Sequence, residues 1–259
     1  MRSYEIIKPV GLTGICDAVE FTCSKAEIFK RSGLKPHHYI IHLDAGQGRT
    51  TVLEYIADMY KAYDILDFES GLDDYIELDF DGTYNNFRNG VETVLDAAVY
   101  SDHYQGIVGV SCSALASHRQ ETQWTEFYTF IKELSKSANL VFFVDYESSK
   151  YDELIINAIK NTISNVDELY EIPYTYDEYA CIIESDIEKK GVVIKNSNEF
   201  HNTILEIVRF NSISAVKDAI SIADEIIQYA DFSTLVPTVS SNDIQSLSQD
   251  KSVSGGIKQ

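Results

Sequence analysis

Cysteine and proline are scarce in this chain, and long apolar runs are absent. Its 259 residues include four cysteines and four prolines. Cys16, Cys23, Cys112 and Cys181 show neither metal-ligand nor disulfide spacing, so we expect free, buried thiols in a reducing compartment. No apolar run approaches the roughly 20 residues that span a bilayer, and residues 1–5 lack the apolar stretch of a secretory signal. We therefore expect a cytoplasmic protein without membrane association.

Basic residues are also few. The chain has 21 Lys and Arg against 41 Asp and Glu, a formal net charge of −20. Such a surface repels the phosphates of nucleic acids at long range, so we do not expect nucleic-acid binding by the isolated chain. A protein partner, or a second copy in a homo-oligomer, fits better. The 17 tyrosines agree with this expectation, because tyrosine is enriched in protein interfaces.

Apolar periodicity predicts alternating strands and helices between residues 37 and 175. The continuous apolar run at residues 140–144 is typical of a strand buried on both faces of a parallel sheet. The alternation predicts an α/β fold, a parallel P-loop-type sheet flanked by helices. The predicted strands are 39–43, 75–80, 106–111, 140–146 and 169–173, and the predicted helices between them are 50–63, 84–100, 122–137 and 151–163.

The sequence pattern changes after Pro173. Thr175 and Glu178 have the spacing of a capping box that begins a helix, and two further helices are predicted at 198–210 and 214–230. We predict an α/β domain over residues 1–174 and a small all-helical lid over 175–231. Residues 232–259 are rich in Ser, Thr, Asn and Gln, which predicts a disordered tail.

The most informative segment is the glycine loop at residues 45–51, between the first predicted strand and the next helix. Strand, glycine loop and helix is the setting of a phosphate-binding loop. The full pattern G-x-x-x-x-G-K-S/T, laid over residues 43–50, is matched only at Gly48 and Thr50. Leu43 replaces the first glycine and Arg49 replaces the lysine. The sequence therefore predicts a damaged nucleotide site.

The chemistry of this loop still suits a phosphate. Backbone N–H groups at a helix N-terminus attract anions, and Gly46 and Gly48 allow positive φ. The Thr50 hydroxyl has the position of a Mg²⁺ ligand, while Arg49 keeps the charge but not the compact ammonium of lysine. The alternative is an ordinary turn whose glycines serve geometry alone. The predicted cofactor is ATP or ADP, with or without Mg²⁺, held by Gly46, Gln47, Gly48, Arg49, Thr50 and Thr51.

The order of these motifs resembles the AAA+ ATPase family. Residues 11–19 open a helix, Leu34 and Pro36 precede the first strand, and residues 46–51 match the family's G-x-G-K-T-T except at Arg49. The resemblance covers residues 8–230. It implies a nucleotide-binding α/β domain, a helical lid, and assembly into rings.

Departures from the family pattern reduce the expected catalysis. The family's third strand ends in an acidic pair that holds Mg²⁺ and polarises water, but here Ser111 and Ser113 occupy that place. Serine cannot act as a general base near neutral pH without an activating neighbour. Asp145 ends the next predicted strand, where the family places a polar sensor. It is a Mg²⁺ ligand, a sensor or a turn-capping acid. The candidate metal ligands are therefore Thr50 and Asp145.

The resemblance and its gaps together predict an AAA+-like protein that is degenerate in both nucleotide motifs. We expect slow or absent hydrolysis and a role as a switch or scaffold in a protein assembly. Two alternatives stay open. One is an interaction protein that kept the fold without nucleotide, and the other is an active NTPase that uses Asp145 for Mg²⁺.

Overall fold

The computed structural model describes residues 6–66, 73–78, 106–112, 121–146, 150–171 and 174–248. The chain divides into two compact units, Met1–Ile172 and Pro173–Gln259. The predicted helix at 84–100 and Ser113 lie outside the described residues. Among the described helices, none is long and apolar enough to cross a membrane.

The first unit is built on a five-stranded parallel sheet with the order β2-β3-β4-β1-β5. Strands β1, β3 and β4 are buried along their whole length, so the predicted parallel α/β sheet is confirmed. Strand β5 begins at Val166 rather than Leu169, because it is an edge strand whose half-exposed, acidic residues break the apolar pattern. The strands are β1 (His38–His42), β2 (Tyr75–Leu78), β3 (Ile107–Ser111), β4 (Asn139–Val144) and β5 (Val166–Tyr170).

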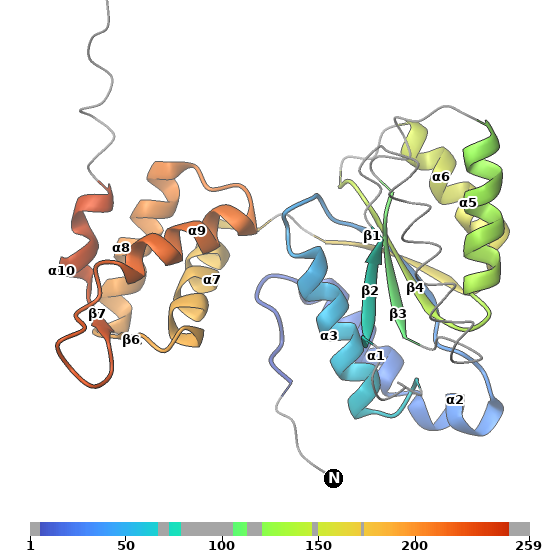
Figure 1. The fold of residues 1–259 in the computed structure, drawn as a ribbon, viewed down its shortest axis with the longest axis horizontal. Helices are drawn as coiled ribbons and strands as arrows, with labels where there is room; N and C mark the ends of the chain where they lie inside the picture. The colour runs from blue at the N-terminus through green and yellow to red at the C-terminus, as the bar shows by residue number, and fades with distance from the viewer. Residues whose placement is uncertain are drawn as a thin grey trace, which may run out of the picture. The chain divides into compact units, whose positions relative to one another are not determined.

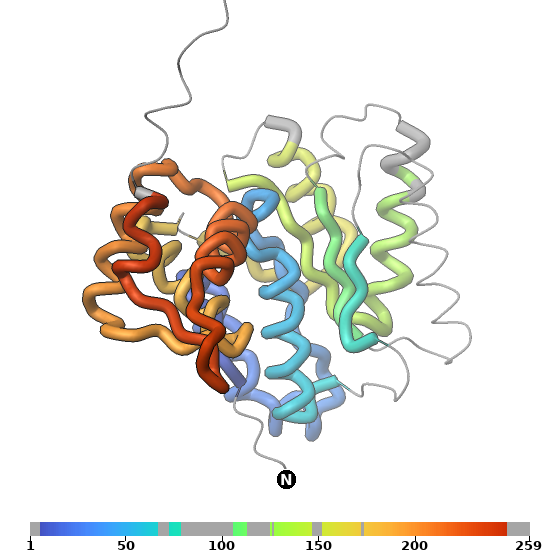
Figure 2. The backbone as a smooth tube through the Cα atoms, turned by 60° about the vertical axis from the view of Figure 1, so that its left-hand side comes forward, coloured from blue at the N-terminus to red at the C-terminus, as the bar shows by residue number. Residues whose placement is uncertain are grey.

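Helices cover both faces of the sheet (Figure 1; Figure 2 gives a second view). Helices α1 (Thr13–Cys23) and α3 (Arg49–Ala62) lie on one face, and α5 (Glu121–Leu134) and α6 (Lys150–Thr162) lie on the other. The short helix α2 (Ala26–Ser32) follows α1. The α5–α6 face forms a continuous apolar core with β3 and β4.

Two contacts fix the helices of the first face. Helix α3 packs so closely on β3 that a Cβ on Gly109 would lie 2.5 Å from Leu53 Cδ1. Helix α1 is held at its N-terminus by the buried Glu171, whose Oε2 accepts the Ile15 N–H at 3.1 Å. A carboxylate near the N-terminus of a helix also interacts favourably with the partial positive charge of the helix dipole.

The second unit contains three longer helices, α7 (Tyr176–Lys189), α8 (Ser197–Asn211) and α9 (Val216–Ile227). Thr175 and Glu178 form the predicted capping box before α7. The expectation of an all-helical unit is corrected, because β6 (Val193–Ile194) pairs in parallel with β7 (Thr238–Val239).

The predicted disordered tail is also corrected in part. Residues 238–248 form β7, α10 (Ser241–Ile244) and a 3₁₀ turn, η2 (Gln245–Ser248). Val239 and Ile244 are fully buried in the core of the second unit. These two apolar residues lie within a polar stretch, so the composition of the stretch did not predict that they are buried. Residues 249–259 of the predicted tail lie outside the described residues.

All four cysteines are free thiols, as predicted, with Cys181 only half-buried and the other three buried. Burial raises the pKa of Cys16 to about 11 and that of Cys23 to about 12. Both thiols of α1 are therefore protonated near neutral pH, which is the behaviour of structural rather than reactive cysteines.

His38 is a buried histidine at the start of β1. Its side chain is 6% exposed, and its Nδ1 accepts the Leu140 N–H at 3.0 Å. Burial lowers the pKa of His38 to about 4, and the charges of Lys35 and His37 lower it further. The folded protein therefore holds this imidazole neutral, with the proton on Nε2.

Substitution of Gly109 by alanine tests the close packing of α3 on β3. Gly109→Ala should destabilise the protein by about 1–3 kcal/mol, because overpacking forces Leu53 or the backbone to move. Urea denaturation followed by circular dichroism measures this cost. In a Leu53→Ala background the new methyl group has room, so the added cost should fall. An equal cost in both backgrounds would contradict the steric explanation.

The stability of the protein should depend on pH through His38. The folded pKa of about 4 lies below the ordinary value of 6.5, so the unfolded chain takes up the proton first as the pH falls. The contribution of the neutral His38 to the stability is fully present above pH 6.5 and is lost progressively towards pH 4. This loss is on the order of 3 kcal/mol. Urea titrations across this window should show a flatter dependence for His38→Gln. A slope that His38→Gln leaves unchanged would contradict the assignment of this pH dependence to His38.

Candidate nucleotide-binding site

The loop between β1 and α3 has a backbone suited to an anion. Gly46 and Gly48 have φ angles of 83° and 90°, in the region that residues with a Cβ rarely adopt. Helix α3 begins at Arg49 with no acidic residue in its first turn. The first helical hydrogen bond runs from the Val52 N–H to the Gly48 carbonyl at 3.0 Å. The N–H groups of residues 49–51 therefore precede the helical ladder and can face a ligand.

The Arg49 side chain turns inward and is only 8% exposed. Its Nε and Nη2 donate to the Leu43 carbonyl at 2.9 and 2.6 Å, and its Nη1 donates to Ser111 Oγ at 2.9 Å. Nη2 also donates to Asp145 Oδ1 at 3.1 Å, and the guanidinium carbon lies 5.5 Å from the centre of the Phe143 ring. One side chain thus joins residues at the carboxyl ends of β1, β3 and β4.

This arrangement decides how well the site fits the predicted ligands. The loop backbone fits a phosphate group, because its glycines and its helix N-terminus are in place. The donor set at Ser111 does not fit Mg²⁺, because a cation there would meet the guanidinium that lies 2.9 Å from the hydroxyl. The geometry of the loop therefore suits a phosphate group, whereas the surroundings of Ser111 do not suit a metal ion.

The two predicted metal ligands have different partners. Thr50 Oγ1 donates to Glu77 Oε2 at 3.1 Å, whereas Asp145 pairs with Arg49. Glu77, on β2, was not among the predicted site residues. In the sequence it is the polar position of an alternating strand, which does not distinguish it from an ordinary surface glutamate. The metal roles of Thr50 and Asp145 stay predictions.

The start of the glycine loop is tied to the segment after β4. Asp44 Oδ1 accepts the Tyr146 N–H at 2.8 Å, and the Asp44 carbonyl accepts the Gln47 N–H at 3.2 Å. The Asp44–Tyr146 bond and the Arg49–Asp145 pair therefore hold the loop to the segment that follows β4.

A polar cluster lies beside the loop at the end of β1. His42 is fully buried, stacks on Tyr170 with ring centres 3.9 Å apart, and has Nε2 2.7 Å from Glu168 Oε1. Burial alone would raise the pKa of Glu168, but hydrogen bonds from Lys160, His42 and Tyr170 outweigh it and lower the pKa to about 2. The ionised Glu168 thus fastens β5 to β1 and to α6, which is a structural role.

No family model and no curated protein matches this sequence. Solved structures of RuvB from Thermotoga maritima are similar in fold. The RuvB Holliday junction branch migration motor has a TM-score of 0.57 and 11% identity, over 92% of this chain and 68% of its own. A point mutant of the same protein has a TM-score of 0.55 and 14% identity, over 85% of this chain and 63% of its own.

RuvB is an AAA+ P-loop ATPase. This chain has the AAA+ fold. The parallel five-stranded sheet with flanking helices is common to both, so the predicted fold class is confirmed. At 11–14% identity the similarity concerns the fold alone.

Removal of the Arg49 side chain tests its structural role. Arg49→Ala leaves the Leu43 carbonyl and the Ser111 hydroxyl without their charged donor, so it should cost about 2–3 kcal/mol of stability. Asp145 is partly exposed and can regain water, which keeps the cost below that of a fully buried ion pair. Urea denaturation measures the change. Arg31→Ala, an exposed arginine on α2, is the matched control and should shift the midpoint little.

Proposed function

We propose that this chain is an AAA+-like nucleotide-binding protein that hydrolyses its ligand slowly or not at all. In this proposal ATP or ADP binds at Gly46, Gln47, Gly48, Arg49, Thr50 and Thr51, and the bound state acts as a switch or scaffold in a protein assembly. The proposal is supported by the inward direction of the Arg49 side chain, beside a loop whose glycines and helix N-terminus suit a phosphate group.

Binding would depend on the backbone more than on side chains. The positive φ angles of Gly46 and Gly48 let the loop backbone approach a phosphate closely. The start of α3 offers backbone N–H donors and the positive end of the helix dipole. The Arg49 charge contributes less, because Asp145 pairs with it at 3.1 Å. The net charge of −20 also opposes a nucleotide at long range. We therefore expect a dissociation constant roughly between 10 μM and 1 mM.

Hydrolysis would lack both a base and a metal position at the end of β3. Ser111 accepts a hydrogen bond from Arg49, and this bond does not make a serine basic. Asp145 would have to leave Arg49 before it could bind Mg²⁺. The active-NTPase alternative therefore requires a rearrangement of the Arg49 contacts, or the use of Glu77 beside Thr50.

The same side chain favours one alternative function. Arg49 already satisfies the Leu43 carbonyl, the Ser111 hydroxyl and the Asp145 carboxylate from within the chain. The fold is therefore complete around this arginine without a phosphate or a metal. A protein that keeps the AAA+ fold purely for interactions with protein partners is consistent with this geometry.

The partner we propose is another protein or a second copy of this chain. The branch migration of Holliday junctions belongs to the Thermotoga maritima protein. The net charge of −20 opposes a comparable contact with DNA by this chain alone.

Calorimetric titration of the full chain with ATP and with ADP tests nucleotide binding. Arg49→Lys completes the G-x-G-K-T-T pattern and offers a compact ammonium to the phosphates, so it should tighten binding about tenfold. Arg31→Lys, on α2, should leave the affinity unchanged. Circular dichroism at the titration temperature establishes that each variant is folded.

Three results would decide between the functions. No heat of binding from the wild-type chain at millimolar ATP or ADP would overturn the proposal in favour of a pure interaction protein. Mg²⁺-dependent phosphate release that Asp145→Asn abolishes would support the active NTPase instead. Binding without phosphate release is the result that we expect.

A further inference from the structure

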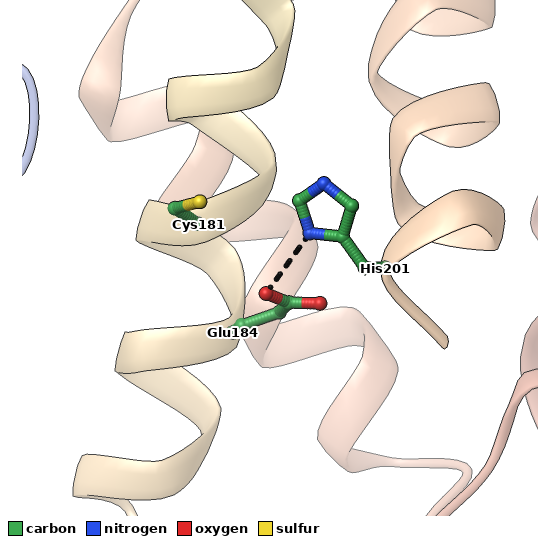
Figure 3. A group of neighbouring side chains, drawn as sticks. All are labelled: Cys181, Glu184 and His201. Atoms are coloured by element: carbon green, nitrogen blue, oxygen red, sulfur yellow. Dashed lines mark hydrogen bonds and ion pairs between the residues drawn. The ribbon is translucent and has the colours of Figure 1, made fainter. Parts of the chain in front are cut away.

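Three potential metal ligands converge in the second unit between α7 and α8 (Figure 3). Cys181 and Glu184 lie three residues apart on α7, on one face of the helix, and His201 lies on α8. Figure 3 shows the sulfur and the carboxylate pointing towards the imidazole ring. One ligand atom from each residue lies within 4.8 Å of the other two.

The two nitrogens of His201 have different carboxylate partners. Nδ1 lies 3.1 Å from Glu184 Oε2, and Nε2 lies 3.2 Å from Asp177 Oδ1. Metal-binding histidines commonly donate the proton of their second nitrogen to a carboxylate, which fixes the tautomer and the ring orientation. Asp177 can hold the Nε2–H in this way, while Nδ1 lies on the side of Cys181 and Glu184. A metal ion there would displace the proton through which Nδ1 pairs with Glu184.

Glu184 supplies an independent observation. Its Oε1 is buried and has no hydrogen-bond partner among the residues that the structure describes. A buried carboxylate oxygen without a partner costs free energy. A cation next to Glu184 would supply the missing partner, whereas the ion pair with His201 uses only Oε2.

We propose that Cys181, Glu184 and His201 bind a divalent transition-metal ion of the zinc class, with Asp177 orienting the imidazole. A thiolate, an imidazole and a carboxylate are the ligands that Zn²⁺ accepts, and sulfur and nitrogen donors disfavour Mg²⁺ and Ca²⁺. Three protein ligands leave a fourth position for water or for a side chain of a partner protein.

Metal binding would cross-link α7 and α8. Burial raises the pKa of Cys181, and the charges of Asp177 and Glu184 raise it further, so the metal displaces a thiol proton as it binds. The bound cation would replace carboxylate repulsion of the thiolate with attraction. Because all four residues belong to the second unit, this proposal is independent of the nucleotide proposal.

Titration of the metal-free full chain with Zn²⁺ and with Co²⁺ tests the site. We expect one Zn²⁺ per chain by calorimetry and a thiolate-to-cobalt charge-transfer band with Co²⁺. Cys181→Ser should abolish that band and weaken Zn²⁺ binding about a hundredfold. Asp177→Asn should weaken binding about tenfold and keep the band, because Asp177 orients a ligand without binding the metal itself.

The controls separate this site from general binding to an acidic protein. Glu188→Gln on α7 and His37→Gln in the first unit remove comparable groups outside the cluster, and both should leave Zn²⁺ affinity unchanged. Cys23→Ala removes a thiol of the first unit and should keep the cobalt band. Zn²⁺ binding that Cys181→Ser does not weaken, or Co²⁺ binding without a thiolate band, would overturn the proposal.

A measurement on the wild-type chain avoids variants that fail to fold. Zn²⁺ should slow the alkylation of Cys181 by iodoacetamide at least tenfold, measured by mass spectrometry, because a ligated sulfur is not a free nucleophile. Mg²⁺ at the same concentration should have no effect. Alkylation of Cys181 that Zn²⁺ leaves unchanged would contradict the proposed site.

Discussion

The guanidinium of Arg49 is the interaction on which the end of the sheet depends. The carboxyl ends of the parallel strands β1, β3 and β4 place the Leu43 carbonyl, Ser111 and Asp145 around one point. A planar fork of N–H donors can reach all three at once, whereas an ammonium is a compact point charge. The glycine loop and the start of α3 are therefore built around this arginine.

Two positions at which this sequence differs from the AAA+ pattern lie together in the structure. Arg49 stands where that pattern has a lysine, and Ser111 stands where it has an acid at the end of β3. The two replacements face each other at 2.9 Å. A carboxylate at Ser111 would bring a second negative charge beside Asp145, and a lysine at position 49 would lose contacts with the strand ends. Either replacement alone would leave a poorer match of donors, acceptors and charge.

The sequence predicted the buried strands well, because continuous apolar runs are distinctive. The fold class followed from their alternation with helices. The sequence predicted the edge strand β5 poorly, because its residues are only partly buried. It also missed the buried Val239, because this apolar residue is isolated in a polar stretch. The direction of the Arg49 side chain was not predictable, because it depends on three strands that meet only in the folded chain.

The cluster of Cys181, Glu184 and His201 shows the same limit. Cys181 and Glu184 have an ordinary helical spacing, and His201 comes from another helix, so the sequence analysis found no metal-ligand pattern around this cysteine. Only the packing of α8 on α7 brings the imidazole to the sulfur and the carboxylate. Sequence spacing detects ligands on one element and misses ligands that tertiary packing assembles.

The contact of Glu171 with α1 has a consequence for synthesis on the ribosome. Ile15 and its acceptor are separated by 156 positions in the chain, which corresponds to roughly ten to thirty seconds of translation. Strands β4 and β5, which flank β1, also emerge long after β1 itself. Helix α1 is therefore made long before the residue that secures it, so chaperones that shield nascent apolar surface should engage this segment before β5 is complete.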